Sequence, residues 1–257
     1  MSAPTGLTAI KKTLMGNVGS HGLSEVWADF CQLSALAIRN SVELNGRDER
    51  EERYLQIAGR YTADDMTRFA EALAGVTNEL SVEPSDVLGR LFMVLELGSS
   101  GMGQFFTPYH VSLLMAEMQA PEMVAHCREH EFVTLNEPTC GAGGMVIAVA
   151  ESLQKAGINY QQQLHVTAQD LSATAVHMTY IQLSLLGIPA VVVHGNTLTV
   201  EQFDARYTPM HILGGWDYKL RQHRALEAVP ALLDVKGPVS VAEPVDEWES
   251  VFAEVSA

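Results

Sequence analysis

A glycine-rich turn near the middle of the chain constrains the fold more than any other feature of the sequence. Residues 141–144, Gly-Ala-Gly-Gly, follow a short apolar run at 132–135 and precede a helical pattern at 145–155. Glycine tolerates left-handed backbone and lets a neighbouring segment or a ligand approach closely. A strand, a glycine turn and a helix in this order are typical of a parallel βαβ unit.

The same pattern continues beyond this first unit. The sequence predicts a strand at 164–169, a helix at 172–186 and an apolar, β-branched strand at 190–194. Because crossovers between parallel strands are right-handed, we expect the three strands to lie side by side. The predicted fold class is therefore α/β, with a Rossmann-like core at residues 101–215.

Helical patterns dominate the residues before this core. Apolar side chains at helical spacing and capping residues predict helices that begin near residues 23, 47, 62 and 86. Either Ser85 or Asp86 can cap the last of these helices. We therefore predict a helical N-terminal domain at residues 1–100, with a flexible joint at 98–101.

The pattern weakens after residue 200. We predict a short strand at 210–213 and a helix at 218–233 that Pro230 disturbs. No Lys or Arg occurs from Gly237 onward, where acidic residues are frequent. Residues 216–257 are accordingly predicted to form a C-terminal helix and an acidic tail.

Composition limits the function classes. The net charge of −15 argues against simple duplex binding, because Lys and Arg supply most of the affinity for phosphates. A local basic face or a partner subunit could still supply that charge, or the acidic surface could serve solubility alone. The three cysteines form no CxxC pair, so we expect no metal site. Without a long apolar run or a signal-peptide pattern, we expect no membrane association and a cytoplasmic location.

Polar side chains close all three predicted strands. Glu137, Asp170 and Asn196 stand where the strands end, and the carboxyl ends of parallel strands meet at one edge of a sheet. A carboxylate at 137 can meet an amino group, and an acid roughly 20–30 residues beyond a glycine turn typically accepts bonds from ribose hydroxyls. Without a ligand, Asp170 would cap the following helix and the other two residues would lie in ordinary turns.

Two further segments have alternative readings. The aromatic pair Phe105-Phe106, next to Thr107 and Pro108, suggests a lid over a pocket, or a linker whose rings pack on the core. The stretch 214–224 interleaves aromatics with cations, which suits phosphate contact and base stacking. Its alternative is a core-anchoring Trp followed by a solvated helix face. Its candidate nucleic-acid residues are Trp216, Lys219, Arg221 and Arg224.

Together these segments resemble a known family. The chain is similar to the modification subunit of type I restriction-modification systems, an N6-adenine DNA methyltransferase, in five segments in the same order: GQFFTP at 103–108, NEPTCGAGG at 136–144, QD at 169–170, LLGI at 185–188 and GNTL at 195–198. The resemblance implies a Rossmann-like methyltransferase core that binds S-adenosylmethionine and acts on adenine N6 in DNA. It also implies DNA and restriction-modification subunits as partners.

The resemblance also assigns cofactor contacts. They run from the methionine end to the adenine ring through Phe106, Thr107, Pro108, Glu137, Cys140, Gly141, Gly143, Asp170 and Asn196. Within this set, Asp170 takes the ribose and Asn196 borders the adenine. The family usually has Asp where this chain has Glu137 and Asn196.

The largest departure lies downstream. The family's catalytic segment, Asn-Pro-Pro-Tyr or Asn-Pro-Pro-Phe, holds the flipped adenine, and no such tetrapeptide occurs in the sequence. The chain reads Phe203 to His211 where this tetrapeptide belongs, which leaves Tyr207, Thr208 and Pro209 as catalytic candidates. The residues that follow are too few for the remaining strands, so we expect a truncated or divergent member.

Three functions follow from the sequence. The chain is an adenine methyltransferase with a divergent catalytic loop, or a catalytically inactive relative that binds restriction-modification subunits or DNA. The third alternative is a methyltransferase for another substrate, with a pocket rebuilt around Tyr207, His211 or Trp216.

Overall fold

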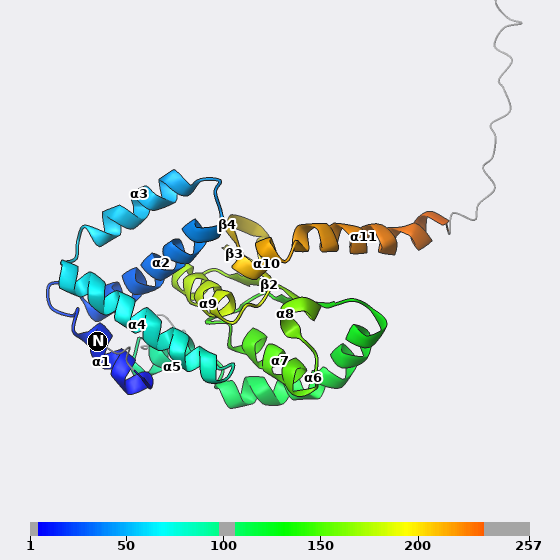
Figure 1. Ribbon diagram of the computed structural model, residues 1–257, viewed down its shortest axis with the longest axis horizontal. Coiled ribbons are helices and arrows are strands. Elements are labelled where there is room, and N and C mark those ends of the chain that lie inside the picture. The colour runs from blue at the N-terminus through cyan, green and yellow to red at the C-terminus, as the bar shows by residue number, and fades with distance from the viewer. Residues whose placement is uncertain (1–4, 98–105, 234–257) are drawn as a thin grey trace, which may run out of the picture. The chain divides into compact units, whose positions relative to one another are not determined.

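The computed structural model describes residues 5–97 and 106–233 (Figure 1). Its elements in chain order are α1 (Leu7–Met15), α2 (Leu23–Val42), α3 (Arg47–Ala58), α4 (Ala63–Val82), α5 (Val87–Val94), α6 (Tyr109–Glu129), β1 (Val133–Glu137), α7 (Gly144–Lys155), α8 (Tyr160–Gln163), β2 (Leu164–Asp170), α9 (Ala173–Leu185), β3 (Ala190–Asn196), β4 (Glu201–Tyr207), α10 (Pro209–Leu213) and α11 (Trp216–Leu233). The predicted joint at 98–101, Phe105 and the predicted tail from Gly237 onward lie outside the described residues.

Capping side chains explain where two of the first helices begin. The Thr62 side chain accepts a hydrogen bond from Asp65 N, and the Asp65 carboxylate accepts one from Thr62 N, which forms a capping box at the start of α4. At α5 the cap is Asp86 rather than Ser85, since its Oδ1 accepts the Gly89 N–H at 2.8 Å. The predicted helical character before the core is confirmed for the residues described.

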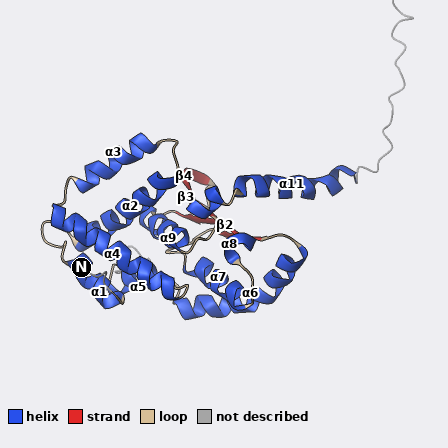
Figure 2. Cartoon of the chain, in the orientation of Figure 1, coloured by secondary structure: helices blue, strands red, loops and turns tan. Residues whose placement is uncertain are grey.

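A single four-stranded sheet in the described part of the chain confirms the α/β fold class (Figure 2). Its strand order is β1-β2-β3-β4. The first three strands are parallel, with Val133 opposite Leu164 and Val166 opposite Ala190. Strand β4 runs antiparallel to β3, so it returns from the carboxyl end of the sheet to the amino end. The carboxyl ends of β1, β2 and β3 therefore lie at one edge, as the sequence predicts.

The two faces of this sheet differ. On one face Val166, Ala168 and Val192 are completely buried, and α7 and α9 pack against the strands. On the other face Thr134 and Asn136 of β1 are exposed. Side chains alternate between the faces of a strand, so Val166, Ala168 and Val192 face these helices and form the core.

The described residues up to Asp217 form one compact unit. Within it α2 of the helical segment packs against α9 of the α/β segment. The predicted domain boundary near residue 100 stays a prediction. The second unit begins at Tyr218, and the structure describes it as the rest of α11. None of the described helices combines the length and apolar character that a membrane crossing needs.

The prediction of a short strand at 210–213 is wrong. Residues Pro209–Leu213 form the helix α10. Proline is well suited to the first turn of a helix because it lacks the N–H that would be unpaired there. Thr208 precedes it as the N-cap residue with extended backbone. The strand lies earlier in the chain, at Glu201–Tyr207.

Candidate functional site

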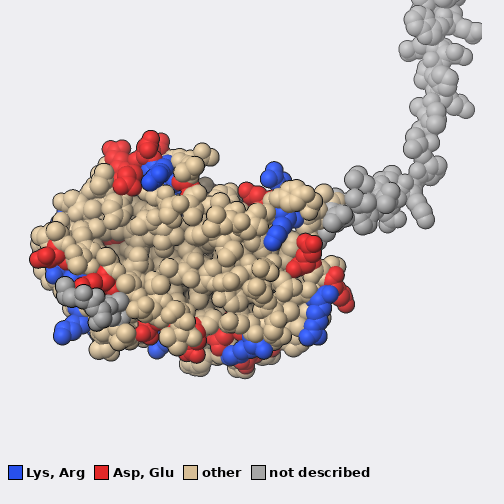
Figure 3. Space-filling view, viewed as in Figure 1, with Lys and Arg blue, Asp and Glu red and all other residues tan. Residues whose placement is uncertain are grey.

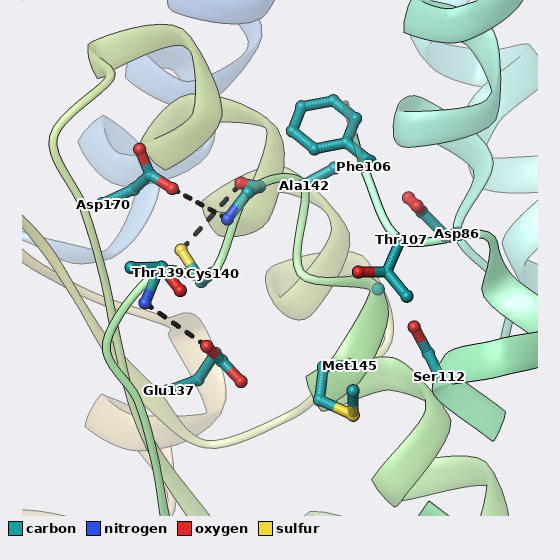
Figure 4. Close-up of a pocket in the computed structure, with 12 residues that line it drawn as sticks. Asp86, Phe106, Thr107, Ser112, Glu137, Thr139, Cys140, Ala142, Met145 and Asp170 are labelled. Carbon is teal, nitrogen blue, oxygen red and sulfur yellow. Dashed lines mark hydrogen bonds between the residues drawn. The ribbon is translucent and has the colours of Figure 1, made fainter. Parts of the chain in front are cut away.

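A hollow of about 430 Å³ opens at the carboxyl ends of β1 and β2 (Figure 4). Its volume lies within the range of roughly 300–1,000 Å³ that is typical of small-molecule sites. Three carboxylates line it, those of Asp86, Glu137 and Asp170, and no Lys, Arg or His does among the residues described. We call this hollow the acidic pocket. The glycine turn, the segment around Phe106 and the start of α7 supply its other walls.

Two glycines of the turn occupy positions where any other residue would be strained. Gly141 has φ +56°, and a Cβ there would lie 2.8 Å from Cδ1 of Phe106. Gly143 has φ +90°, and a Cβ there would lie 3.2 Å from Oγ1 of Thr179. Both the left-handed backbone and the close neighbours therefore favour glycine, and Gly141 lines the acidic pocket.

Asp170 joins the glycine turn to the end of β2. Its Oδ2 accepts the Gly141 N–H at 2.9 Å, and its Oδ1 accepts the Ser172 N–H at 2.8 Å. The N-cap residue of α9 is Ser172, whose hydroxyl accepts the Ala175 N–H, so the alternative of Asp170 as the cap itself is wrong. A carboxylate has about four lone-pair sites, so Asp170 keeps about two for a ligand in the pocket.

Glu137 lies at the end of β1 and is only half-buried. Its Oε1 accepts the Thr139 N–H at 3.3 Å, and its second oxygen has no hydrogen-bond partner among the described residues. Figure 4 shows Glu137 and Asp170 on one side of the acidic pocket, and Asp86 with Thr107 on the other. A ligand in the pocket would lie between carboxylates.

Asp86 is the pocket residue that the sequence reasoning missed. It is buried, accepts hydrogen bonds from Gly89 N and Gln182 Nε2, and burial raises its pKa. A Cβ at Gly144 would lie 3.1 Å from its Oδ2, so the carboxylate faces the start of α7. Helix N-termini attract negative charge. The sequence offers Asp86 only as a candidate helix cap, and local pattern gives no sign that its carboxylate also lines a pocket.

Cys140 has a structural position in the turn. The thiol is buried, and burial raises its pKa to about 12, so it stays protonated at neutral pH. The Thr179 hydroxyl donates to Gly141 O at 2.8 Å and holds the turn against α9. No group of three or more His, Cys, Asp or Glu side chains in the described ranges is arranged to hold a metal ion.

The structure brings six of the nine predicted cofactor residues to the acidic pocket. These are Phe106, Thr107, Glu137, Cys140, Gly141 and Asp170. Pro108, Gly143 and Asn196 do not line it. Pro108 precedes α6 as its N-cap residue, and Gly143 lies behind the turn against Thr179.

Asn196 is engaged in its own loop. Its Oδ1 accepts the N–H groups of Leu198 at 3.0 Å and Thr199 at 3.4 Å. The loop still lies beside the glycine turn, because Thr197 Oγ1 donates to Pro138 O at 2.6 Å. These bonds occupy the carbonyl oxygen and leave the side-chain NH2 group as a possible donor, so the role of Asn196 at the adenine stays a prediction.

The candidate catalytic residues Tyr207, Thr208 and Pro209 lie at the opposite end of the sheet. Thr208 Oγ1 donates to Ile188 O at 2.8 Å and accepts the N–H of Ala190, the first residue of β3, at 2.9 Å. A seven-residue strand is about 20 Å long, so this end is far from the acidic pocket. The suggestion that these residues replace the catalytic tetrapeptide at the pocket does not fit the fold. An antiparallel β4 is the physical reason.

Trp216 is not available to stack on a base. It is completely buried, with its ring centroid 5.0 Å from that of Phe132 and 5.2 Å from that of His165. This burial corrects the nucleic-acid assignment of Trp216 and agrees with the alternative of a core anchor. The other three candidates, Lys219, Arg221 and Arg224, lie on α11 in the second unit, where both arginines are exposed.

Comparisons with known proteins agree with the resemblance found in the sequence. A family model described as N-6 DNA Methylase matches residues 90–219, just over half of the chain. A search of curated proteins found no match to the chain.

Two solved structures are similar to the chain over 77% of its length. One is a Listeria monocytogenes protein assigned as a class I S-adenosylmethionine-dependent methyltransferase, with 11% identity, a TM-score of 0.42 and 55% of that chain covered. The other is the methyltransferase subunit of a type I restriction-modification system from Streptococcus thermophilus, with 19% identity, a TM-score of 0.39 and 41% of that chain covered. The chain thus spans about half the length of these solved chains.

Proposed function

The chain belongs to the N-6 DNA methylase family, and from this premise we propose that its acidic pocket binds S-adenosylmethionine. The observation that carries the proposal is the position of Glu137 and Asp170. These two carboxylates end neighbouring parallel strands on either side of the glycine turn and line one hollow. Ligands of open α/β sheets bind in this place, beyond the carboxyl ends of the strands.

Charge supports this ligand. S-adenosylmethionine carries a sulfonium and an ammonium group, and three carboxylates line the pocket. Opposite charges within a few ångströms attract strongly where water is partly excluded. When bound, the cofactor would supply the methyl group, and the pocket residues would bind and orient it.

Two carboxylates have free acceptor sites for this task. Asp170 uses one lone pair of each oxygen on backbone N–H groups, which holds the carboxylate still while leaving sites for the ribose hydroxyls. The free oxygen of Glu137 would accept from the ammonium group. The Phe106 ring, packed on Gly141, would offer an apolar contact beside them.

Calorimetric titration with S-adenosylmethionine tests the proposal. We expect saturable binding to the wild type, and a loss of about 10- to 100-fold in affinity for Asp170→Ala because charge-assisted hydrogen bonds are removed. Asp64→Ala is the matched control, since Asp64 is exposed and in no described hydrogen bond. Folded wild type that gives no heat at millimolar ligand would reject the proposal, and equal losses in both variants would reject the role of Asp170.

For the reaction, we propose methyl transfer to adenine in DNA, the chemistry of the family. A second candidate is a cofactor-binding protein that has no activity alone and acts through restriction-modification subunits or DNA. The second candidate is favoured by the position of Tyr207, Thr208 and Pro209, because no substitute for the catalytic tetrapeptide lies at the pocket among the described residues.

Transfer of labelled methyl groups to unmethylated DNA separates the two candidates. The purified chain is assayed alone and with the other subunits of a restriction-modification system. Transfer by the chain alone establishes the first candidate and contradicts the second. Transfer only in the mixture would show that partners complete the adenine site.

A further inference from the structure

A second hollow, of about 220 Å³, lies between α2, α3, α9 and β4. Four arginines line it, one or two from each of α2, α3 and β4, and we call it the arginine pocket: Arg39, Arg50, Arg53 and Arg206. Figure 3 shows basic and acidic side chains side by side over α3. The two acids that also line the pocket, Glu49 and Asp204, leave it with an excess of positive charge in a chain of net charge −15.

One guanidinium in this pocket is incompletely paired. Arg206 is only 8% exposed, and its Nε donates to Asp204 Oδ2 at 2.9 Å. Its Nη1 is buried and has no hydrogen-bond partner in the described part of the chain. A buried charged donor without an acceptor is destabilising, and such groups in folded proteins usually meet a ligand, an ion or water.

The other arginines differ in how firmly they are held. Arg39 donates to Glu43, Asp204 and Ala205 O, which fixes its guanidinium in the wall of the pocket. Arg50 donates to a side-chain amide and two backbone carbonyls and is fixed in the same way. Arg53 is exposed, and its described hydrogen bond, to Gln32 Oε1, is long at 3.5 Å. It can therefore turn toward an anion at little cost.

His177 completes the wall from α9. It is buried and makes no hydrogen bond with the described residues. Burial, with smaller effects from Arg206 and His194, lowers its pKa to about 3, so the ring is neutral at physiological pH. A neutral imidazole offers one N–H donor, and so it adds to the donors of the pocket without adding charge.

We propose that the arginine pocket binds a small oxyanion, a free phosphate or a small molecule that ends in a phosphoryl or carboxylate group. The acceptor oxygens would pair with Nη1 of Arg206 and with Arg53, against a scaffold held by Arg39. Guanidinium forks suit planar and tetrahedral oxyanions because they donate two parallel hydrogen bonds. The hollow has room for such a group, since one water occupies about 30 Å³ of liquid.

Titration of the full chain with inorganic phosphate, and separately with succinate, tests this site against sodium chloride at matched ionic strength. We expect saturable binding of at least one of the two anions, and the arm that binds identifies the phosphoryl or carboxylate class. Arg206→Met and Arg53→Ala should each weaken binding about tenfold or more. Arg128→Met is the matched control, since Arg128 is exposed on α6 and far from these elements in the chain.

If Arg206→Met fails to fold, Arg53→Ala still tests the site. Arg53 is exposed and weakly hydrogen-bonded, so we expect this variant to fold. Binding of neither anion beyond the chloride control would overturn the proposal, and would show that water alone meets Nη1 of Arg206. Equal weakening in Arg53→Ala and Arg128→Met would overturn it as well, because the effect would then be one of net charge.

Discussion

The acidic pocket and the arginine pocket lie in the same compact unit but are lined by opposite charges. Most of the acidic pocket comes from the strand ends and glycine turn between Glu137 and Asp170, to which Asp86 and the segment around Phe106 are added. The arginine pocket collects side chains from α2, α3 and β4, which are as far apart as Arg39 and Arg206. Net charge therefore says little about which ligand a given surface of this protein selects.

The two pockets also differ in how their charged groups are paired. Both oxygens of Asp170 already accept backbone N–H groups, so the carboxylate is held in place before any ligand arrives. Nη1 of Arg206 has no acceptor among the described residues. The acidic pocket is thus a preorganised site, and the arginine pocket is one that an anion would stabilise.

The largest expected effect sharpens this comparison at the glycine turn. Gly141→Ala should lower the free energy of unfolding by about 2–3 kcal/mol, because left-handed backbone is strained for alanine and the Cβ would meet the Phe106 ring. Gly157→Ala is the control, since Gly157 also has positive φ but nothing within 4 Å of a Cβ, and should cost about 1 kcal/mol. Chemical denaturation measures both. Equal losses of unfolding free energy in the two variants would mean that the turn relaxes to make room for the added methyl group.

The next effect concerns the arginine pocket and pH. The folded-state pKa of His177, about 3, lies below its ordinary value of 6.5, so the unfolded chain takes up a proton first as the pH falls. The contribution of His177 to the free energy of unfolding is therefore fully present above pH 6.5. It falls as the pH is lowered, by about 2 kcal/mol at pH 5. Denaturation curves at pH 7 and pH 5 should show a loss that is smaller by about 2 kcal/mol in His177→Gln than in the wild type, while the buried His211, whose pKa burial also lowers, contributes to the loss in both proteins. The exposed His110 gives the control, and a His110→Gln variant with the same flattened profile would contradict the assignment.

The smallest effect tests whether the two pockets are independent. They share no lining residue, so saturating phosphate should change the affinity for S-adenosylmethionine by less than about twofold at constant ionic strength. Calorimetry with and without phosphate measures this. A change of tenfold or more would show that the two pockets are coupled. They would then have to be treated as one linked site and not as two independent ones.

Local patterns in the sequence predict most of the elements up to β3 and part of the acidic pocket. The glycine turn, the strand-end position of Asp170 and the capping box at Thr62 each depend on neighbouring residues, which the sequence displays directly. The resemblance to the modification subunit added Phe106 and Thr107, whose positions depend on a segment before β1. Whether these residues hold a cofactor stays a prediction.

Long-range packing explains what the sequence could not predict. Strand β4 is antiparallel, which carries Thr208 to the wrong end of the sheet, and nothing in residues 201–207 specifies that direction. Trp216 is buried by Phe132 and His165, which lie far away in the sequence. The arginine pocket could not be foreseen for the same reason, because three separate elements bring its side chains together.

A crystal structure of the chain grown with S-adenosylhomocysteine, the demethylated cofactor, tests the central claim most directly. The account predicts the ligand in the hollow at the ends of β1 and β2, with its ribose hydroxyls on Asp170 and its amino group within reach of Glu137. A ligand bound elsewhere, or an empty hollow at saturating concentration in crystals that leave it open to solvent, would contradict the account.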